Sequence, residues 1–197
     1  MEKENTIHPA FQKNYYLFRK KLFKLFGEAF HTYDENGRVL FYSKQKAFKL
    51  KEDFRIYSDE TQNQELLAIK TPQILDIGAT YYVHDSMADE PVGALRRQAL
   101  KSIFKDEWTL LSKDGQIIAK ITEIHAFAAL ASRLIKLIPQ RYIIVTPEET
   151  TIAEIKQHFN PFVLKYSMTI SEPEPLIDRR LLVAAGILLS GIEGREE

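Results

Sequence analysis

The chain has 197 residues, and its 27 Lys and Arg balance its 27 Asp and Glu, so the formal net charge is zero. This length is typical of one globular domain, and the neutral balance lacks the cation excess that general nucleic-acid binding requires. The absence of cysteine excludes disulfides, thiolate nucleophiles and cysteine metal sites. The polar first ten residues lack a signal-peptide core, so we expect a cytoplasmic protein.

Short runs rich in aromatic and β-branched residues follow a polar stretch at 1–13, which we expect to be a flexible tail. Turn sequences such as Asp34–Gly37 and Ser112–Gly115 join several of these runs as hairpins. The predicted strands lie within 14–26, 29–33, 38–42, 54–57, 66–70, 81–84, 92–101, 108–111, 116–122, 141–145, 152–159 and 162–170. Residues 125–138 have helical spacing, and Pro139 ends them. So many closely spaced strands favour a barrel or a sandwich over a parallel sheet.

The segment from Leu181 to Ile192 is apolar on every face of a helix. A helix of this length is about 18 Å long and cannot span the roughly 30 Å of a bilayer core. Charged residues flank it at 178–180 and 193–197, and extending the helix into them would bury charge. An apolar helix that does not span lipid must be surrounded by protein. We therefore expect no transmembrane segment and a core helix inside a β-rich domain.

Four segments carry a resemblance to a known family: FHTYDENGRVLFYSKQK (30–46), the long run 91–121, NPFVLKYSMTI (160–170) and PLIDRRLLVAAGILLSGI (175–192). They resemble the tubby-like superfamily, which includes the phospholipid scramblases and the LURP-one-related proteins. The resemblance implies a mainly β fold, a closed antiparallel barrel of about twelve strands around a buried C-terminal helix. The implied organisation is a single domain over 14–193, with the core helix at 176–192.

The resemblance implies less about function. Tubby proteins bind phosphoinositides through basic surface residues, scramblases are linked to calcium-dependent lipid movement, and the LURP-one-related branch has no well-defined activity. This chain is similar to that branch because it lacks the proline-rich extension and the palmitoylatable cysteines of scramblases.

Catalytic and metal-binding patterns are weak. His84 lies near Asp85, Asp89 and Glu90, but a solvated acidic turn explains this group as well as a metal site does. No nucleophile elbow, nucleotide-binding fingerprint or set of convergent inward polar residues stands out. We expect a protein that is not an enzyme and needs no cofactor or metal.

Two basic clusters are the candidate binding residues. The first contains Arg19, Lys21, Lys44 and Lys46, and the second contains Arg96 and Arg97. Anionic lipid surfaces attract such clusters, although the solvated outer face of a barrel, with cations balanced by nearby acids, is the favoured interpretation of the charges themselves.

The leading hypothesis is a non-enzymatic binding or interaction module of the LURP-one-related type. It would contact anionic phospholipid head groups, or a membrane surface on which it is peripheral, through these clusters. The alternatives are scramblase-like lipid transport, a small-molecule site inside the barrel, and a protein partner bound by a strand edge or by residues 125–138.

Overall fold

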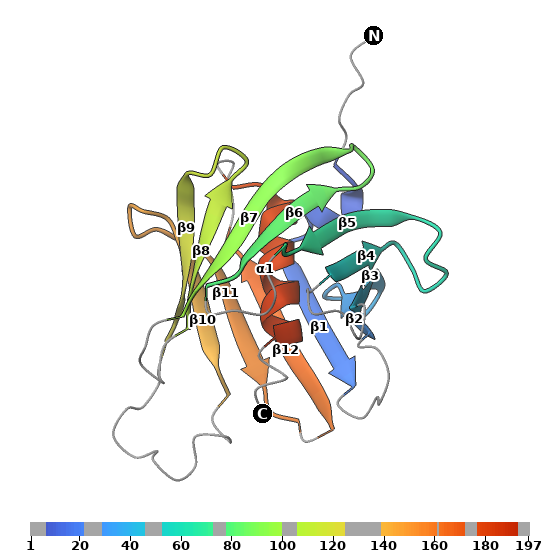
Figure 1. Cartoon of the computed structure of the whole chain (residues 1–197). Coiled ribbons are helices and arrows are strands. Elements are labelled where there is room, and N and C mark those ends of the chain that lie inside the picture. The colour runs from blue at the N-terminus through green and yellow to red at the C-terminus, as the bar shows by residue number, and fades with distance from the viewer. Residues whose placement is uncertain are drawn as a thin grey trace.

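A computed structural model describes residues 7–21, 29–45, 53–72, 78–99, 106–124, 139–160, 162–171 and 177–192. Twelve antiparallel strands form a closed barrel around one C-terminal helix (Figure 1). The strands are β1 (Tyr15–Lys21), β2 (Ala29–Tyr33), β3 (Val39–Gln45), β4 (Asp53–Tyr57), β5 (Glu65–Lys70), β6 (Thr80–Asp85), β7 (Glu90–Ala99), β8 (Asp106–Ser112), β9 (Ile117–Glu123), β10 (Arg141–Val145), β11 (Thr151–His158) and β12 (Val163–Ile170). The predicted fold class is confirmed.

The strands follow one another around the barrel in chain order, and β1 closes the ring by pairing with both β2 and β12. Strands that are consecutive in the chain are therefore also neighbours in the barrel. The predicted Asp34–Gly37 turn is present, where Asp34 Oδ1 accepts hydrogen bonds from the N–H groups of Asn36 and Arg38. Alternation along the strands sets the two faces: in β2, buried Phe30 and Thr32 alternate with partly exposed Ala29, His31 and Tyr33.

The helix α1 (Arg179–Ile192) runs through the centre of the barrel (Figure 1). Its side chains from Leu181 to Leu189 are almost fully buried and belong to one hydrophobic cluster with side chains of the surrounding strands. The expectation of an apolar helix surrounded by protein is confirmed. In the part of the chain that the structure describes, no helix is both long enough and apolar enough to cross a membrane.

Two glycines let α1 approach the barrel wall. A Cβ added at Gly186 would lie 2.4 Å from the Phe18 ring, and one at Gly191 would lie 2.6 Å from the Phe54 ring. The helix thus fits because glycine leaves room for two phenylalanines of the wall. The buried Lys20 donates from Nζ to the Gly191 carbonyl at 3.4 Å, where a cation complements the negative end of the helix dipole.

Some boundaries differ from the sequence-based expectations. Within the tail predicted at 1–13, Pro9–Gln12 form a short 3-10 helix, and Phe11 is buried with its ring stacked on Phe41 at 4.8 Å. The packed chain therefore starts before residue 14. The core helix, predicted from residue 176, begins at Arg179 because the Asp178 side chain accepts a hydrogen bond from the Arg180 N–H. The helix predicted at 125–138 lies outside the described residues.

The barrel has two distinct ends, which lie at the top and bottom of Figure 1. We call the upper one the latch end, because there the start of α1 is bound to the β6–β7 turn through Arg180. We call the lower one the tip end, after the β11–β12 turn at residues 159–162. The latch end holds the tight hairpin turns, and the tip end holds the C-terminal end of α1.

Candidate functional site

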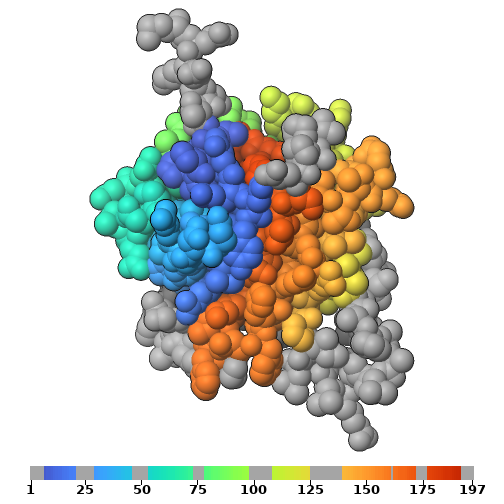
Figure 2. Space-filling view, turned by 180° about the vertical axis from the view of Figure 1, so that it is seen from behind, coloured from blue at the N-terminus to red at the C-terminus, as the bar shows by residue number. Residues whose placement is uncertain are grey.

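The first predicted basic cluster lies on the outer wall formed by β1, β2 and β3. Arg19 on β1 and Lys44 on β3 are both exposed, with β2 between them. The side chain of Lys21 and the whole of Lys46 lie outside the described residues. Figure 2 shows this wall, in blue, beside the orange strands of the β11–β12 hairpin. Because β1 pairs with β12, residues of the β11–β12 hairpin lie beside this wall although they are far from it in the sequence.

A surface pocket of about 200 Å³ lies on this wall. It is partly open to solvent and contains one predicted residue, Arg19, with several others that sequence reasoning missed. Its lining residues are Arg19, Ala29, His31, Tyr33, Tyr42, Glu60 and Val163. The small side chain of Ala29 leaves a gap between the larger residues around it. The pocket thus joins one cation, a histidine and two phenols on a short stretch of three strands.

Cross-strand pairing fixes the polar residues of the pocket in a row. Arg19 pairs with His31, and His31 pairs with Tyr42, so their side chains stand side by side on the outer face. The Arg19 guanidinium lies 5.6 Å from the centre of the Tyr33 ring, a cation–π contact that orients it without neutralising it. Register and aromatic packing therefore hold the Arg19 charge at the pocket wall.

Glu60 forms one side of the pocket from the β4–β5 turn. Its Oε1 lies 2.5 Å from His31 Nε2, and the Glu60 side chain remains 72% exposed. An exposed carboxylate on a flexible side chain can leave such a contact at small cost. The His31 ring, which also packs on Tyr42 at 5.3 Å, is therefore a polar group that an incoming ligand could reach.

The second predicted cluster does not join the first. β7 lies across the ring from β1, six strands away in either direction. Neighbouring residues of a strand also face opposite ways. Arg96 is exposed and donates to Thr80 Oγ1 at 3.4 Å, whereas Arg97 pairs in register with the buried Trp108 and lies 6.0 Å from its ring centre. Arg96 and Arg97 thus do not form one outward patch.

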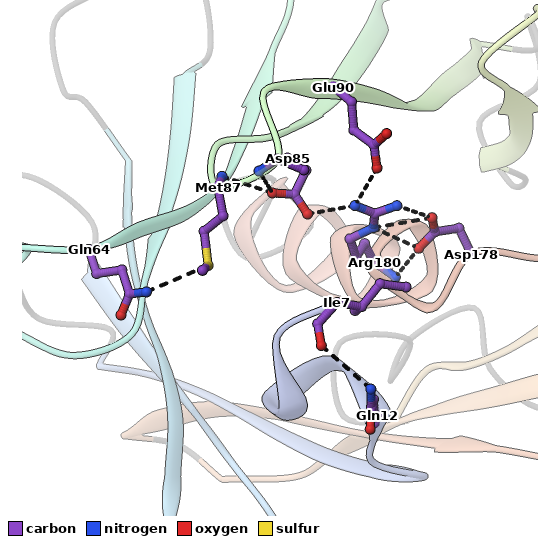
Figure 3. A network of polar contacts seen from close by, with 9 residues as sticks. Ile7, Gln12, Gln64, Asp85, Met87, Glu90, Asp178 and Arg180 are labelled. Carbon is purple, nitrogen blue, oxygen red and sulfur yellow. Dashed lines mark hydrogen bonds and ion pairs between the residues drawn. The ribbon is translucent and has the colours of Figure 1, made fainter. Parts of the chain in front are cut away.

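The suggested metal cluster at residues 84–90 is divided between two sets of contacts. His84 and Asp89 pair with each other at 3.0 Å near the surface. Asp85 and Glu90 contact the buried Arg180 instead, with Nη1 distances of 2.6 Å and 3.0 Å (Figure 3). Within the described ranges, no set of three or more potential ligand residues is arranged to hold a metal ion.

The Arg180 network is a structural latch. Asp178 accepts three further hydrogen bonds from the guanidinium, so three carboxylates surround one buried cation (Figure 3). Burial alone would raise the pKa of Asp85, but hydrogen bonds from the Ala88 N–H, from Arg180 and from the Met87 N–H outweigh burial and leave this pKa below its usual range. The network binds the start of α1 to the β6–β7 hairpin, 95 residues away along the chain.

The inward face of β2 and β3 carries polar side chains that the sequence analysis did not recognise. Thr32, Ser43 and Gln45 are buried, and one side-chain oxygen of each has no hydrogen-bond partner in the structure as described. Their cross-strand neighbours are large and apolar: Thr32 pairs with Phe18, and Gln45 pairs with Phe54. Inward polar side chains are therefore present on this wall, where they lie among the apolar residues of the core.

The comparisons agree with the fold. A search of curated proteins gave no match. A family model described as LURP-one-related matches residues 39–190, a stretch that begins at β3 and ends inside α1. The barrel, its central helix and this match, which covers most of the chain, establish that the chain belongs to the LURP-one-related family.

Proposed function

We propose that this protein is a non-enzymatic binding module whose pocket on β1, β2 and β3 takes the anionic head group of a phospholipid at a cytoplasmic membrane surface. The observation that carries the proposal is the state of Arg19, which lines the pocket and has no carboxylate partner among the described residues. Guanidinium groups bind phosphate through paired hydrogen bonds. The Tyr33 and Tyr42 hydroxyls and the His31 ring supply further polar contacts at the same wall.

The charges around the pocket support an anionic ligand. Lys165 pairs with Arg19 in register, and it too has no acidic partner in the described ranges. Lys44 is exposed and contacts the neutral Gln62 side chain at 3.3 Å. By contrast, Arg55 on the neighbouring strand is neutralised by two carboxylates. Cations near an anionic bilayer contribute about 1 kcal/mol each. We therefore expect Arg19, Lys44 and Lys165 to contact the anionic lipid, rather than the neutralised Arg55.

The outer wall is a better location for this site than the barrel interior. The centre of the barrel is occupied by α1, whose side chains are packed against the inward residues of the wall. Opening an interior path for a lipid, or a cavity for a small molecule, would require moving this helix and exposing the apolar surface that it buries. Binding at the outer wall is therefore favoured over scramblase-like transport.

Vesicle co-sedimentation tests the proposal. The double charge reversal R19E/K44E should weaken binding to vesicles of equal parts phosphatidylcholine and phosphatidylserine at least about tenfold, since two attractive charges become repulsive. The matched control is R38E/R96E, which makes the same change in net charge at exposed arginines outside the pocket. Equal binding by R19E/K44E and the unaltered protein would reject the site. Equal losses of vesicle binding in the two variants would show that overall charge, and not this pocket, determines binding.

A further inference from the structure

The β11–β12 turn exposes two phenylalanines. Phe159 is 63% exposed and Phe162 is 68% exposed, more than any other large hydrophobic residue that the structure describes. Single apolar residues on a surface are common, but here two exposed phenylalanines flank the same turn. Figure 2 shows the end of this hairpin, in orange, projecting from the lower edge of the molecule.

The described residues on both sides of the turn are connected by hydrogen bonds. Asn160 Oδ1 accepts from the N–H groups of Phe162 and Val163, each at 3.0 Å. The flanking strands stay paired up to His158 and Lys165, the last register pair before the turn. Both phenylalanines therefore extend from a paired hairpin that holds them in place, which lowers the entropy cost of inserting them into another phase.

The same hairpin is continuous with the proposed head-group pocket. Val163, the residue after Phe162, lines that pocket. In register, His158, Lys165 and Arg19 form a row across β11, β12 and β1, directly beside the turn. Aromatic residues at a tip with cations immediately behind them match the order of layers in an anionic bilayer, where apolar chains lie beneath charged head groups.

We infer that Phe159 and Phe162 insert into the interfacial layer of an anionic bilayer and anchor the barrel there by its tip end. The inference rests on the proposed function for the position of the head-group site, and it adds the orientation of the protein and the residues that enter the lipid. A bilayer fits this surface better than a protein partner because charge and apolar surface are arranged in successive layers along the hairpin.

A site-specific fluorescence label tests the insertion directly. The chain has no cysteine, so F162C can carry a single environment-sensitive NBD label. The control is I117C, because Ile117 is 51% exposed and begins β9 at the latch end. With vesicles of equal parts phosphatidylcholine and phosphatidylserine, the label at 162 should brighten and shift to the blue, and the label at 117 should stay unchanged. No change at 162 under conditions where the protein sediments with vesicles would overturn the inference.

Paired substitutions measure the contribution of the two side chains. F159S/F162S should bind the same vesicles at least about tenfold more weakly, because two apolar side chains no longer enter the lipid. The matched control is V39S/I117S, which removes similarly exposed apolar residues at the latch end and should bind as the unaltered protein does. Thermal melts of both variants establish that they fold. Equal vesicle binding by F159S/F162S and V39S/I117S would contradict the anchor.

The outcomes separate this inference from the head-group pocket. If R19E/K44E binds normally while the label at 162 still enters the lipid, the pocket is wrong and the anchor holds. If R19E/K44E loses binding while F159S/F162S does not, the pocket holds and the anchor is wrong. If F159S/F162S instead abolishes a concentration-dependent dimer seen by analytical ultracentrifugation and leaves vesicle binding intact, the turn is a contact between two copies and the lipid anchor is rejected.

Discussion

At the latch end, Arg180 is buried and three carboxylates surround it, whereas at the tip end Phe159 and Phe162 are exposed to water. The charged groups of the latch end are paired with one another inside the protein. The two phenylalanines of the tip end are instead left mostly in contact with water. Arg19, on the wall beside the β11–β12 hairpin, likewise has no carboxylate partner in the described part of the chain.

This difference separates stability from binding. A buried ion network is costly to break because the remaining charges stay buried without compensation. Exposed side chains, by contrast, contribute little to the stability of the folded state. Substitutions at the latch end should therefore lower the free energy of unfolding, and substitutions at the tip end should alter vesicle binding and leave stability unchanged.

The largest expected effect comes from removing the buried cation. R180M leaves Asp85, Glu90 and Asp178 without their shared partner, and it should lower the free energy of unfolding by about 3–5 kcal/mol. Urea denaturation followed by circular dichroism measures this change. The control R38M alters an exposed arginine and should shift the free energy by no more than about 0.5 kcal/mol. Similar shifts for the two variants would show that the latch does not hold α1.

A smaller effect is expected at the opposite end of the same helix, which close packing rather than charge holds in place. In G191A the new methyl group would meet the Phe54 ring, and the variant should lose about 1–3 kcal/mol despite the higher helix propensity of alanine. The double variant G191A/F54L makes room for the methyl group. The losses in free energy of unfolding of the single variants G191A and F54L should therefore not add up to the loss of the double variant. Strictly additive losses would contradict this packing.

Acid should weaken the latch. The folded-state pKa of Asp85 lies below its ordinary value of 3.8, so its contribution to stability is present above that value and is lost as the pH falls through the lower folded-state pKa. The stability difference between the unaltered protein and D85N should stay constant from about pH 6 to about pH 5 and should shrink as the pH falls below about 4 toward about 3. Denaturation at a series of pH values measures the difference. A constant gap over this range would exclude Asp85 as a source of acid sensitivity.

The smallest expected effect on stability belongs to the tip end. F159S/F162S removes side chains that already contact water over most of their surface, so its free energy of unfolding should stay within about 0.5 kcal/mol of the unaltered protein. The same urea experiment measures it. A loss comparable to that of R180M would mean that the two phenylalanines support the fold, and the contrast between the ends would fail.

Local sequence patterns predicted the elements well. The bounds predicted for β2 and β10 match those observed, because alternation and turn residues act over a few positions. The buried α1 was predictable because its apolar residues cover every face. The latch was not predictable, since the barrel fold brings Arg180 and Asp85 together from distant parts of the chain and no local sequence pattern links them.

The candidate site was predicted in part. Arg19 and Lys44 were chosen for their charge, but His31, Tyr33 and Glu60 join Arg19 through strand register and the path of the β4–β5 turn. Short-range signals were nevertheless present for some of the missed residues. The alternation of β2 places His31 and Tyr33 on one face. The Asn160-Pro161 turn signal places the phenylalanines on either side of it at an exposed tip.

Hydrogen–deuterium exchange with and without anionic vesicles compares the two ends in one measurement. Binding should slow backbone exchange in β1–β3 and at the β11–β12 turn, which contact the bilayer in the proposed orientation. The β6–β7 turn at the latch end should exchange at the same rate in both samples. Protection of the β6–β7 turn with no change at the β11–β12 turn would contradict the claim that the protein meets membranes by its tip end.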